Sequence, residues 1–326
     1  MLPTPLQPLM VPPRVSIDEV TMLRKRLFSL LLLGLSPFAS LAAEPEAPGT
    51  PAGFTFRYLT ATDGVPLNVV ETGNPQGPAI IFLHGYTQSY LSWHPQLDDA
   101  VLRAKYRLIA VDLRGHGASG KPWDKAAYAG HLPWARDVRS VVEQLGVSRP
   151  WLVGWSFGGF VAMDYVREYG EAAVAGVMMT GSHGGLLSRP MGPPPAFTGD
   201  LDLAIEGART FMKMMSVQPP AAATIDRGTY ANVMMPPYVR NAMWGKRLDN
   251  TDLTPRLKLP VLMILGRQDL SLPADTIATA LASRSNITVR IFEQTGHSAF
   301  IEHPAQFNQE LAAFVAKAGV AKGSAQ

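Results

Sequence analysis

Near its middle the chain reads Trp151-Leu152-Val153-Gly154-Trp155-Ser156-Phe157-Gly158-Gly159, a short apolar run followed by a serine set among glycines. The apolar run predicts a buried strand, and the helical spacing of residues 160–169 predicts a helix directly after it. A strand that passes so abruptly into a helix must turn sharply at Ser156, and the neighbours of such a strained turn must be small. The turn pushes the serine hydroxyl out at the carboxyl end of the strand, where ligands bind in parallel sheets. We therefore interpret Ser156 as a candidate nucleophile.

Glycines on either side of a serine also occur in ordinary turns. Taken alone, the pentapeptide Gly154-Trp155-Ser156-Phe157-Gly158 supports both interpretations equally. Its position between an expected strand and an expected helix favours the nucleophile. A neutral serine hydroxyl reacts slowly, so this interpretation requires a base and a group that orients the base.

Short apolar runs alternate with helical spacing along most of the chain. The expected strands are residues 54–60, 65–72, 79–83, 107–111, 151–153, 174–179, 261–265 and 287–292, and the first two are expected to form a hairpin. The expected helices are residues 134–145, 160–169, 274–282 and 304–317. This alternation predicts an α/β fold in which a mostly parallel sheet is covered by helices on both faces.

One long segment, at about residues 183–255, breaks the alternation. It holds seven of the fourteen methionines and three proline runs. A segment of this length between two strands is too long for a simple loop, so we expect it to fold over the sheet as a cap. Two interpretations of the methionines remain open. Their flexible side chains either line an apolar lid over a pocket or fill contacts between cap and core.

The base is assigned to His297, one of seven histidines. It lies in Gln294-Thr295-Gly296-His297-Ser298, a glycine turn directly after the last expected strand. This position brings it to the same edge of the sheet as Ser156. His84 and His116 are expected to order their own loops, and the remaining histidines have no comparable position at the end of a strand.

Asp269 is the candidate that orients this base, because it follows the seventh expected strand and a glycine turn. Asp275 falls in an expected helix, where an acid in the first turn has a simpler explanation. Glu293 and Glu302 lie too close to His297 in the sequence to approach the imidazole easily from its far side. The resulting chain order is serine, aspartate, histidine.

Two backbone N–H groups are expected to hold a developing oxyanion. One belongs to Phe157, directly after the nucleophile, and the other to Tyr86, in the loop His84-Gly85-Tyr86 after the third strand. Trp93 and Trp155 lie near the expected site and are candidates for a substrate pocket. Packing in the core explains these two tryptophans at least as well.

Together these segments resemble the α/β-hydrolase superfamily over about residues 54–315. The matching motifs are His84-Gly85, Asp112-Leu113-Arg114-Gly115-His116-Gly117, Gly154-Trp155-Ser156-Phe157-Gly158-Gly159, Gly266-Arg267-Gln268-Asp269 and Gly296-His297. They are most similar to the branch of small esterases, perhydrolases and cofactor-free haloperoxidases. The resemblance implies an eight-stranded sheet, a cap after the sixth strand, and no metal or organic cofactor. In the related epoxide hydrolases and haloalkane dehalogenases the nucleophile is an aspartate, so Ser156 argues against both activities.

The composition agrees with a globular domain, since 47% of the 326 residues are hydrophobic and 17% are charged. The chain has no cysteine, which excludes disulfides, a cysteine nucleophile and thiolate metal sites. Four basic and two acidic residues fall within the first 43, so most of the net charge of +3 belongs to that segment. No basic patch suggests a nucleic-acid partner.

Residues 22–43 have the layout of a secretory signal peptide. A basic head, Met22-Leu23-Arg24-Lys25-Arg26, precedes an apolar run and the small residues of Ser40-Leu41-Ala42-Ala43. The run is shorter than the roughly 20 residues that span a bilayer, so we expect no stable membrane anchor. The expected organisation is an upstream extension at 1–21, a signal peptide cleaved near Ala42-Ala43, a linker at 44–53 and a hydrolase domain at 54–326. We accordingly expect a periplasmic or secreted protein.

The sequence therefore predicts a serine hydrolase that cleaves carboxylic esters, thioesters or lactones of small to medium apolar molecules through an acyl-enzyme. The same three residues also fit perhydrolysis with peroxide, or hydrolysis of a carbon–carbon bond. A ligand receptor that keeps the fold without turnover is a third interpretation. The expected partner is a small-molecule ester, with no metal and no cofactor.

Overall fold

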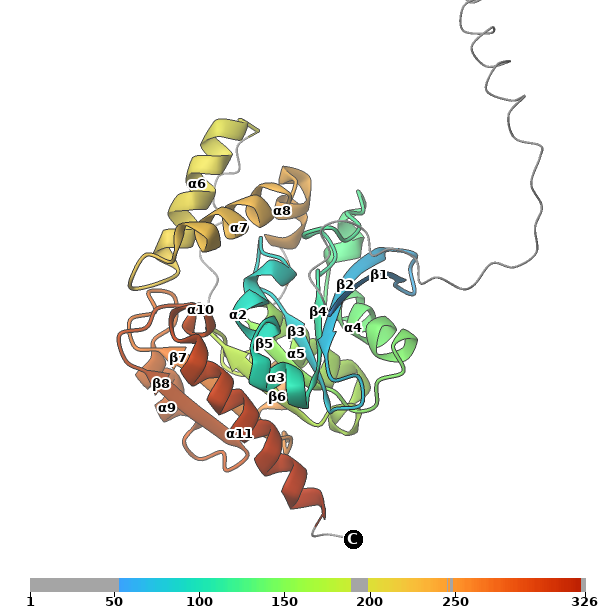
Figure 1. Cartoon of the computed structure of the whole chain (residues 1–326), viewed down its shortest axis with the longest axis vertical. Coiled ribbons are helices and arrows are strands. Elements are labelled where there is room, and N and C mark those ends of the chain that lie inside the picture. Colours follow the sequence, from blue (N-terminus) through green and yellow to red (C-terminus); the bar gives the residue numbers. More distant parts are fainter. Residues whose placement is uncertain (1–52, 189–198, 245, 247–248, 324–326) are drawn as a thin grey trace, which may run out of the picture. The chain divides into compact units, whose positions relative to one another are not determined.

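The computed structural model describes residues 53–188, 199–244, 246 and 249–323 (Figure 1). The expected upstream extension, the signal peptide and all but the last residue of the linker lie outside these residues. So do Met191 and the proline run 193–195 of the expected cap. None of the helices in the described part is long and apolar enough to cross a membrane.

A single eight-stranded sheet forms the centre of the described domain. Its strands are β1 (Phe54–Thr60), β2 (Pro66–Gly73), β3 (Ala79–Leu83), β4 (Arg107–Val111), β5 (Trp151–Trp155), β6 (Gly176–Thr180), β7 (Val261–Gly266) and β8 (Ile287–Phe292). Their order across the sheet is β1-β2-β4-β3-β5-β6-β7-β8, and β2 alone runs in the direction opposite to the other strands. The expected eight-stranded, mostly parallel sheet is confirmed.

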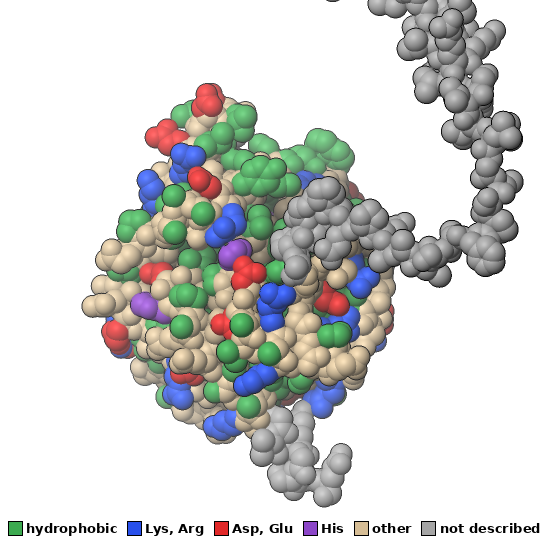
Figure 2. Space-filling view, viewed as in Figure 1, with side chains coloured by type: hydrophobic (Ala, Val, Ile, Leu, Met, Phe, Trp, Pro, Cys, Tyr) green, Lys and Arg blue, Asp and Glu red, His purple; other side chains and the backbone are tan. Residues whose placement is uncertain are grey.

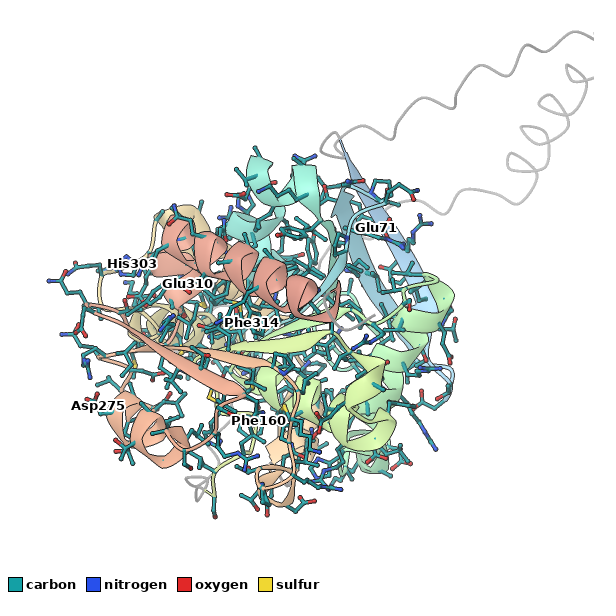
Figure 3. The ribbon with its side chains drawn as sticks, turned by 90° about the horizontal axis from the view of Figure 1, so that it is seen from below. Glu71, Phe160, Asp275, His303, Glu310 and Phe314 are labelled. Carbon is teal, nitrogen blue, oxygen red and sulfur yellow. The ribbon has the colours of Figure 1, made fainter. Side chains whose placement is uncertain are left out.

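Helices cover both faces of the sheet. One face is covered by α4 (Leu132–Gln144), α5 (Phe157–Tyr169) and α9 (Ala274–Leu281). The other is covered by α2 (His94–Leu97), α3 (Ala100–Lys105), α10 (Ala299–Glu302) and α11 (Pro304–Gly323). Single turns of 3-10 helix are η1 (Tyr90–Trp93), η2 (Lys125–Tyr128), η3 (Glu171–Ala173) and η4 (Thr251–Leu253). Figure 3 shows α11, with Phe314 labelled, lying across the strands. The ring of Phe314 packs edge-on against that of Trp151 in β5, with 5.2 Å between the ring centroids.

Burial on both faces explains why the central strands β3 to β7 are almost continuously apolar. In β3, Ile81 and Leu83 belong to the core that also contains side chains of α4 and α5. Ile80 and Phe82 belong to the core that contains side chains of α11. Successive side chains of a strand point to opposite faces, so the sheet separates two apolar cores and is held by both.

In the described part of the segment between β6 and β7, three further α-helices are present, namely α6 (Leu201–Met214), α7 (Ala222–Val233) and α8 (Pro237–Trp244). We call these three helices and their linkers the cap. Figure 1 shows them together at one end of the domain, with α6 and α7 in contact. Met212 and Met235 are buried, whereas Met214 is 58% exposed. Packing accounts for the buried methionines, and apolar side chains also gather over the outside of these helices (Figure 2).

The loop after β3 is fixed by the buried side chain of His84. Its Nε2 accepts a hydrogen bond from the backbone N–H of Leu113, at 3.0 Å. Nδ1 therefore carries the proton of the neutral ring, and this N–H donates a hydrogen bond to the carbonyl oxygen of Gly85, at 2.8 Å. Burial lowers the pKa of His84, which keeps the ring neutral. These two bonds hold the backbone that leads into Tyr86.

Candidate active site

Ser156 lies between β5 and α5 in a backbone conformation that residues with side chains rarely adopt. Its φ is 50° and its ψ is −114°, a conformation that stores strain. Gly158 permits the turn, since a Cβ there would lie 2.0 Å from the carbonyl oxygen of Leu83. The backbone N–H of Ser156 donates to the carbonyl oxygen of Thr180, at 2.9 Å. This geometry holds Ser156 at the carboxyl edge of the sheet.

Asp269 and His297 lie on the loops after β7 and β8 and are hydrogen-bonded to each other. Nδ1 of His297 is 2.7 Å from Oδ2 of Asp269. Oδ1 of Asp269 accepts hydrogen bonds from the hydroxyl and from the backbone N–H of Ser271, both at 2.7 Å. Burial acts to raise the pKa of Asp269, but the hydrogen bonds from His297 and Ser271 outweigh it and lower that pKa. Asp269 is therefore ionised at neutral pH.

The imidazole of His297 lies at the carboxyl ends of β5 and β6. Gly181 is so close to it that a Cβ there would lie 3.1 Å from both Nδ1 and Cε1. Trp155, the last residue of β5, donates from Nε1 to the carbonyl oxygen of His297, at 3.0 Å. Gly181 follows Thr180, which binds the backbone N–H of Ser156. These links bring His297 to the same edge of the sheet as Ser156.

Both expected oxyanion donors lie at this edge. Phe157 begins helix α5, and N–H groups in the first turn of a helix have no partner within that helix. Tyr86 lies in the loop after β3, directly before Thr87, whose φ is 62°. Asn232 of α7 donates from Nδ2 to the hydroxyl oxygen of Thr87, at 2.9 Å. The cap is therefore in contact with the loop that carries Tyr86.

A cavity of about 380 Å³ lies between this loop and the cap. Its lining is mostly apolar and includes Tyr86, Leu203, Ala204, Ala208, Phe211, Val233, Met235 and Pro237. Two charged residues, Asp200 and Arg240, also line it. The Arg240 side chain donates from Nε to the carbonyl oxygen of Met235, at 3.0 Å, and burial lowers its pKa. Because the cavity borders Tyr86, it is the candidate substrate pocket.

The two tryptophans proposed for the pocket lie in the core. The ring of Trp93 is fully buried, with its centroid 5.0 Å from that of Phe82 and 4.4 Å from that of Phe300. The ring of Trp155 also packs against Phe300, at 5.0 Å. Neither tryptophan lines the cavity of 380 Å³. Both side chains belong to the core on the face of the sheet that α11 covers. Core packing therefore accounts for both tryptophans.

The acids considered beside Asp269 are engaged elsewhere. Asp275 and Glu293 both pair with the guanidinium of Arg267 at the surface. Glu302 accepts hydrogen bonds from the backbone N–H groups of Val217 and Gly296. Ser271, which bonds to Asp269, and Glu302 are two polar residues of the site region that no sequence pattern singles out. In the described part of the chain, no group of three or more His, Asp or Glu residues is arranged to hold a metal ion.

Residues 80–310 match the family model described as alpha/beta hydrolase family. A solved structure of an inferred aryl esterase from Burkholderia cenocepacia is 32% identical, with a TM-score of 0.74 over 81% of this chain and 99% of that one. Esterase RhEst1 from Rhodococcus sp. ECU1013 is 30% identical, with a TM-score of 0.71 over 80% of this chain and 98% of that one. A non-heme haloperoxidase from Rhodococcus erythropolis is 28% identical over 285 residues, which cover 79% of this chain and 98% of the relative. By its sequence and its fold, this chain belongs to the α/β-hydrolase family.

Proposed function

We propose that the protein is a serine hydrolase of carboxylic esters, with Ser156 as nucleophile, His297 as base and Asp269 as the group that orients the base. The observation that carries this proposal is the 2.7 Å hydrogen bond between Asp269 and His297, at the sheet edge where Ser156 occupies its strained turn. A nucleophile, a base and a buried carboxylate are the three groups that acyl transfer through a serine requires.

In the first step, Oγ of Ser156 attacks the carbonyl carbon of the ester while Nε2 of His297 takes the hydroxyl proton. Asp269 accepts the hydrogen bond from Nδ1–H, which leaves Nε2 unprotonated and able to act as the base. The N–H groups of Phe157 and Tyr86 stabilise the oxyanion, and losing one such donor typically slows turnover by about 100- to 1000-fold. His297 then returns its proton to the leaving alcohol, and the acyl group stays on Ser156.

In the second step, a water molecule attacks the acyl-enzyme while His297 takes one of its protons. The second tetrahedral oxyanion is held by the same two backbone N–H groups. Its collapse breaks the bond to Oγ, the imidazole returns a proton to Ser156, and the carboxylic acid leaves. Asp269 stabilises the imidazolium that forms in both steps, because it remains ionised.

The cavity beside Tyr86 supports substrates of small to medium size. Its volume of about 380 Å³ and its mostly apolar lining fit a short aliphatic or aromatic acyl group. The two similar solved structures, both described as esterases, support an ester bond as the bond that is cleaved. Thioesters and lactones present the same kind of electrophilic carbonyl carbon to Ser156, so the proposed reaction includes them as substrates.

Perhydrolysis is the second candidate function, and the similarity to a non-heme haloperoxidase favours it. In that reaction hydrogen peroxide, rather than water, attacks the acyl group on Ser156. The products are a peracid and the free serine, and His297 acts as the base in the same way. Hydrolysis of a carbon–carbon bond in a dicarbonyl compound would start from the same triad.

A substrate panel separates these activities. It contains 4-nitrophenyl acetate, butyrate and octanoate, a thioester, a lactone, a β-diketone, and acetate with hydrogen peroxide. We expect the wild-type protein to turn over at least one carboxylic ester, and Ser156→Ala to lose that activity. Ser285→Ala, at an exposed serine, is the matched control and should remain active. No turnover of any ester by the wild type, or full turnover by Ser156→Ala, would contradict the proposal.

We also propose that the protein is exported, on the basis of the signal-peptide pattern at residues 22–43. The full-length gene product should then appear outside the cytoplasm with an N-terminus near Ala43. Sequencing the N-terminus of the exported protein tests this expectation. A mature chain that begins before Arg24 would contradict it.

A further inference from the structure

The linker between α6 and α7, residues 215–221, lies against the loop that carries His297. The backbone N–H of His297 donates to the carbonyl oxygen of Met215, at 2.9 Å. A Cβ at Gly296 would lie 3.1 Å from both the carbonyl oxygen of Met215 and Cα of Ser216, so the glycine permits this close approach. The cap and the loop of the proposed base are therefore in direct backbone contact.

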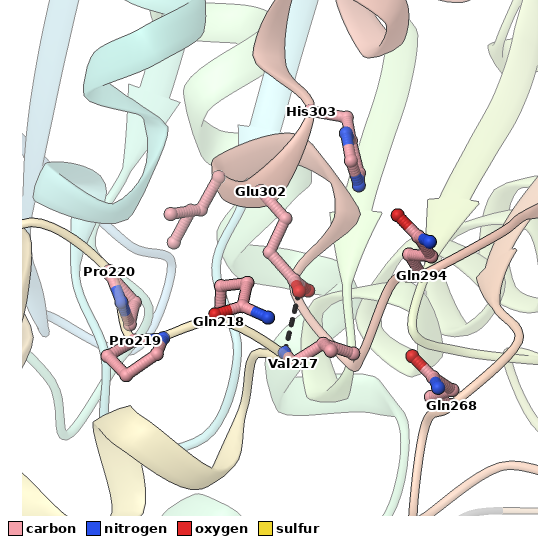
Figure 4. A pocket seen from close by; sticks show the side chains of 9 residues that line it. Val217, Gln218, Pro219, Pro220, Gln268, Gln294, Glu302 and His303 are labelled. Carbon is pink, nitrogen blue, oxygen red and sulfur yellow. Dashed lines mark hydrogen bonds between the residues drawn. The ribbon is translucent and has the colours of Figure 1, made fainter.

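The carboxylate of Glu302 bridges the same two segments. Its Oε1 accepts a hydrogen bond from the backbone N–H of Gly296, at 2.9 Å. Its Oε2 accepts one from the backbone N–H of Val217, at 2.7 Å, which is the dashed line in Figure 4. Hydrogen bonds to an ionised acceptor are roughly twice as strong as those between neutral groups. One side chain thus joins the cap linker to the residue next to His297.

We propose that Glu302 is a positioning residue. Its two hydrogen bonds to Val217 and Gly296, which we call the latch, join the cap linker to the His297 loop and so hold the imidazole in its reactive orientation. This inference rests on the proposed function, in which His297 is the base. Glu302 acts through Gly296 and Val217, and it does not line the cavity of 380 Å³ that is the candidate substrate pocket. The same side chain then holds the cap linker in place and aligns His297, so a shift of the linker would also shift the imidazole.

The core anchors Glu302 independently of the cap. Glu302 is the last residue of α10, a single helical turn directly after the His297 loop. Phe300 in the same turn is fully buried, with its ring 4.4 Å from that of Trp93 and 5.0 Å from that of Trp155. The carboxylate is therefore held at a fixed point of the domain, against which both the linker and the His297 loop are aligned.

A cavity of about 470 Å³ borders the latch. The cap linker forms one part of its lining through Val217, Gln218, Pro219 and Pro220, and Gln268 and Gln294 come from loops of the core (Figure 4). A segment that faces a cavity has few packing contacts on that side. The hydrogen bonds made by Met215 and by Glu302 must therefore carry a larger share of the attachment of this linker.

Glu302→Gln isolates the latch from the size of the side chain. A carboxylate offers two acceptor oxygens, whereas an amide offers one, and its NH₂ group would face a backbone N–H donor. One of the two hydrogen bonds is then lost at nearly constant volume. Glu302→Ala removes both acceptors. Glu310→Gln is the matched control, because it makes the same chemical change on α11, where the carboxylate lies 3.8 Å from Arg290.

Three measurements use full-length protein, with 4-nitrophenyl butyrate or another ester from the panel as the substrate. We expect kcat of Glu302→Gln to fall by roughly tenfold to a hundredfold, since small displacements of a catalytic group have effects of that size. KM should change much less. Labelling of Ser156 by a fluorophosphonate should slow by a factor similar to that for kcat. Amide hydrogen exchange should accelerate at Val217 and Gly296 but not in the core strands.

Glu302→Ala should lose at least as much kcat as Glu302→Gln, and Glu310→Gln should match the wild type in every measurement. Wild-type kcat and labelling rate in Glu302→Gln would overturn the latch. So would a loss of kcat accompanied by faster exchange throughout the core strands, because Glu302 would then only stabilise the fold. If the wild-type protein itself is not labelled on Ser156, the proposed function fails, and that result is distinct from a failure of the latch alone.

Discussion

The hydroxyl oxygen of Ser271 lies 3.0 Å from Nδ1 of His297 and 2.7 Å from Oδ1 of Asp269. The hydroxyl thus donates a hydrogen bond to the carboxylate of Asp269, which in turn orients the imidazole of His297. Replacing Ser271 by alanine removes the hydroxyl but keeps the backbone N–H that also binds Asp269. One hydrogen bond of this kind contributes about 1 kcal/mol, so kcat/KM for an ester should fall by about fivefold.

Ser271→Thr, which keeps a hydroxyl at a position exposed to solvent, should restore most of the activity. Steady-state kinetics on a single 4-nitrophenyl ester checks both variants. Equal kcat/KM in Ser271→Ala and the wild type would show that Ser271 has no part in orienting His297.

Asp269→Asn should affect kcat far more than KM. The amide cannot stabilise an imidazolium, and its NH₂ group favours the wrong tautomer of His297. In serine proteases the corresponding change costs on the order of 10⁴ in kcat. Asp275→Asn is the control, because that carboxylate is exposed and pairs with Arg267 at the surface. A loss of less than tenfold in Asp269→Asn would remove Asp269 from the proposed mechanism.

Asp164 of α5 and Lys246, which follows α8, form a buried ion pair between core and cap. Nζ of Lys246 is 2.5 Å from Oδ2 of Asp164, and both side chains are about 1% exposed. Burial lowers the pKa of Lys246. Breaking a buried pair by removing one charge typically costs about 3–5 kcal/mol. Asp164→Asn should therefore lower the free energy of unfolding by an amount of that order in urea titrations at pH 7.

Glu143→Gln is the control for this measurement. Its carboxylate pairs with Arg139 across one turn of α4, and both side chains are well exposed. Exposed pairs of this kind contribute about 0–1 kcal/mol. Equal losses of stability in Asp164→Asn and Glu143→Gln would contradict a stabilising role for the buried pair.

The described domain should lose stability in mildly acidic solution. Burial lowers the pKa of His84 and holds that of His116 well below its ordinary value of 6.5. At these two histidines the unfolded chain therefore binds more protons than the folded chain below about pH 6.5. Stability is then fully present above that pH and is lost progressively as the pH falls toward the pKa values of the folded state.

Urea unfolding between pH 7.5 and pH 5 checks this pH dependence. Stability that is constant across the whole range would contradict neutral, buried states of His84 and His116.

The order of strands and helices could be predicted because a buried parallel sheet imposes a simple pattern. Apolar runs mark the strands, and glycine turns separate them from helices. The ends of the elements were predicted less well. The helix expected at residues 160–169 begins at Phe157, because it starts directly after the strained turn, and the low helix propensity of Gly158 and Gly159 hides that start. The last helix continues to Gly323 instead of ending near residue 317.

The sequence indicated Ser156, Asp269 and His297 because each follows an expected strand, and strand ends of a parallel sheet share one edge. Ser271 and Glu302 carry no such signal, since their partners are chosen by the three-dimensional course of the loops. Glu302 is five residues from His297, too near to reach the far side of the imidazole. It instead binds the backbone of Val217, a residue 85 positions away in the sequence.

Ser156 is tested as the nucleophile by finding which residue reacts with a fluorophosphonate, by mass spectrometry of the labelled and digested protein. We expect one adduct on the full-length protein, at Ser156, and none in Ser156→Ala. Labelling should also be strongly slowed in His297→Ala, because the hydroxyl then has no base. An adduct at another residue, or labelling of Ser156 in His297→Ala at the wild-type rate, would contradict Ser156 as a nucleophile activated by His297.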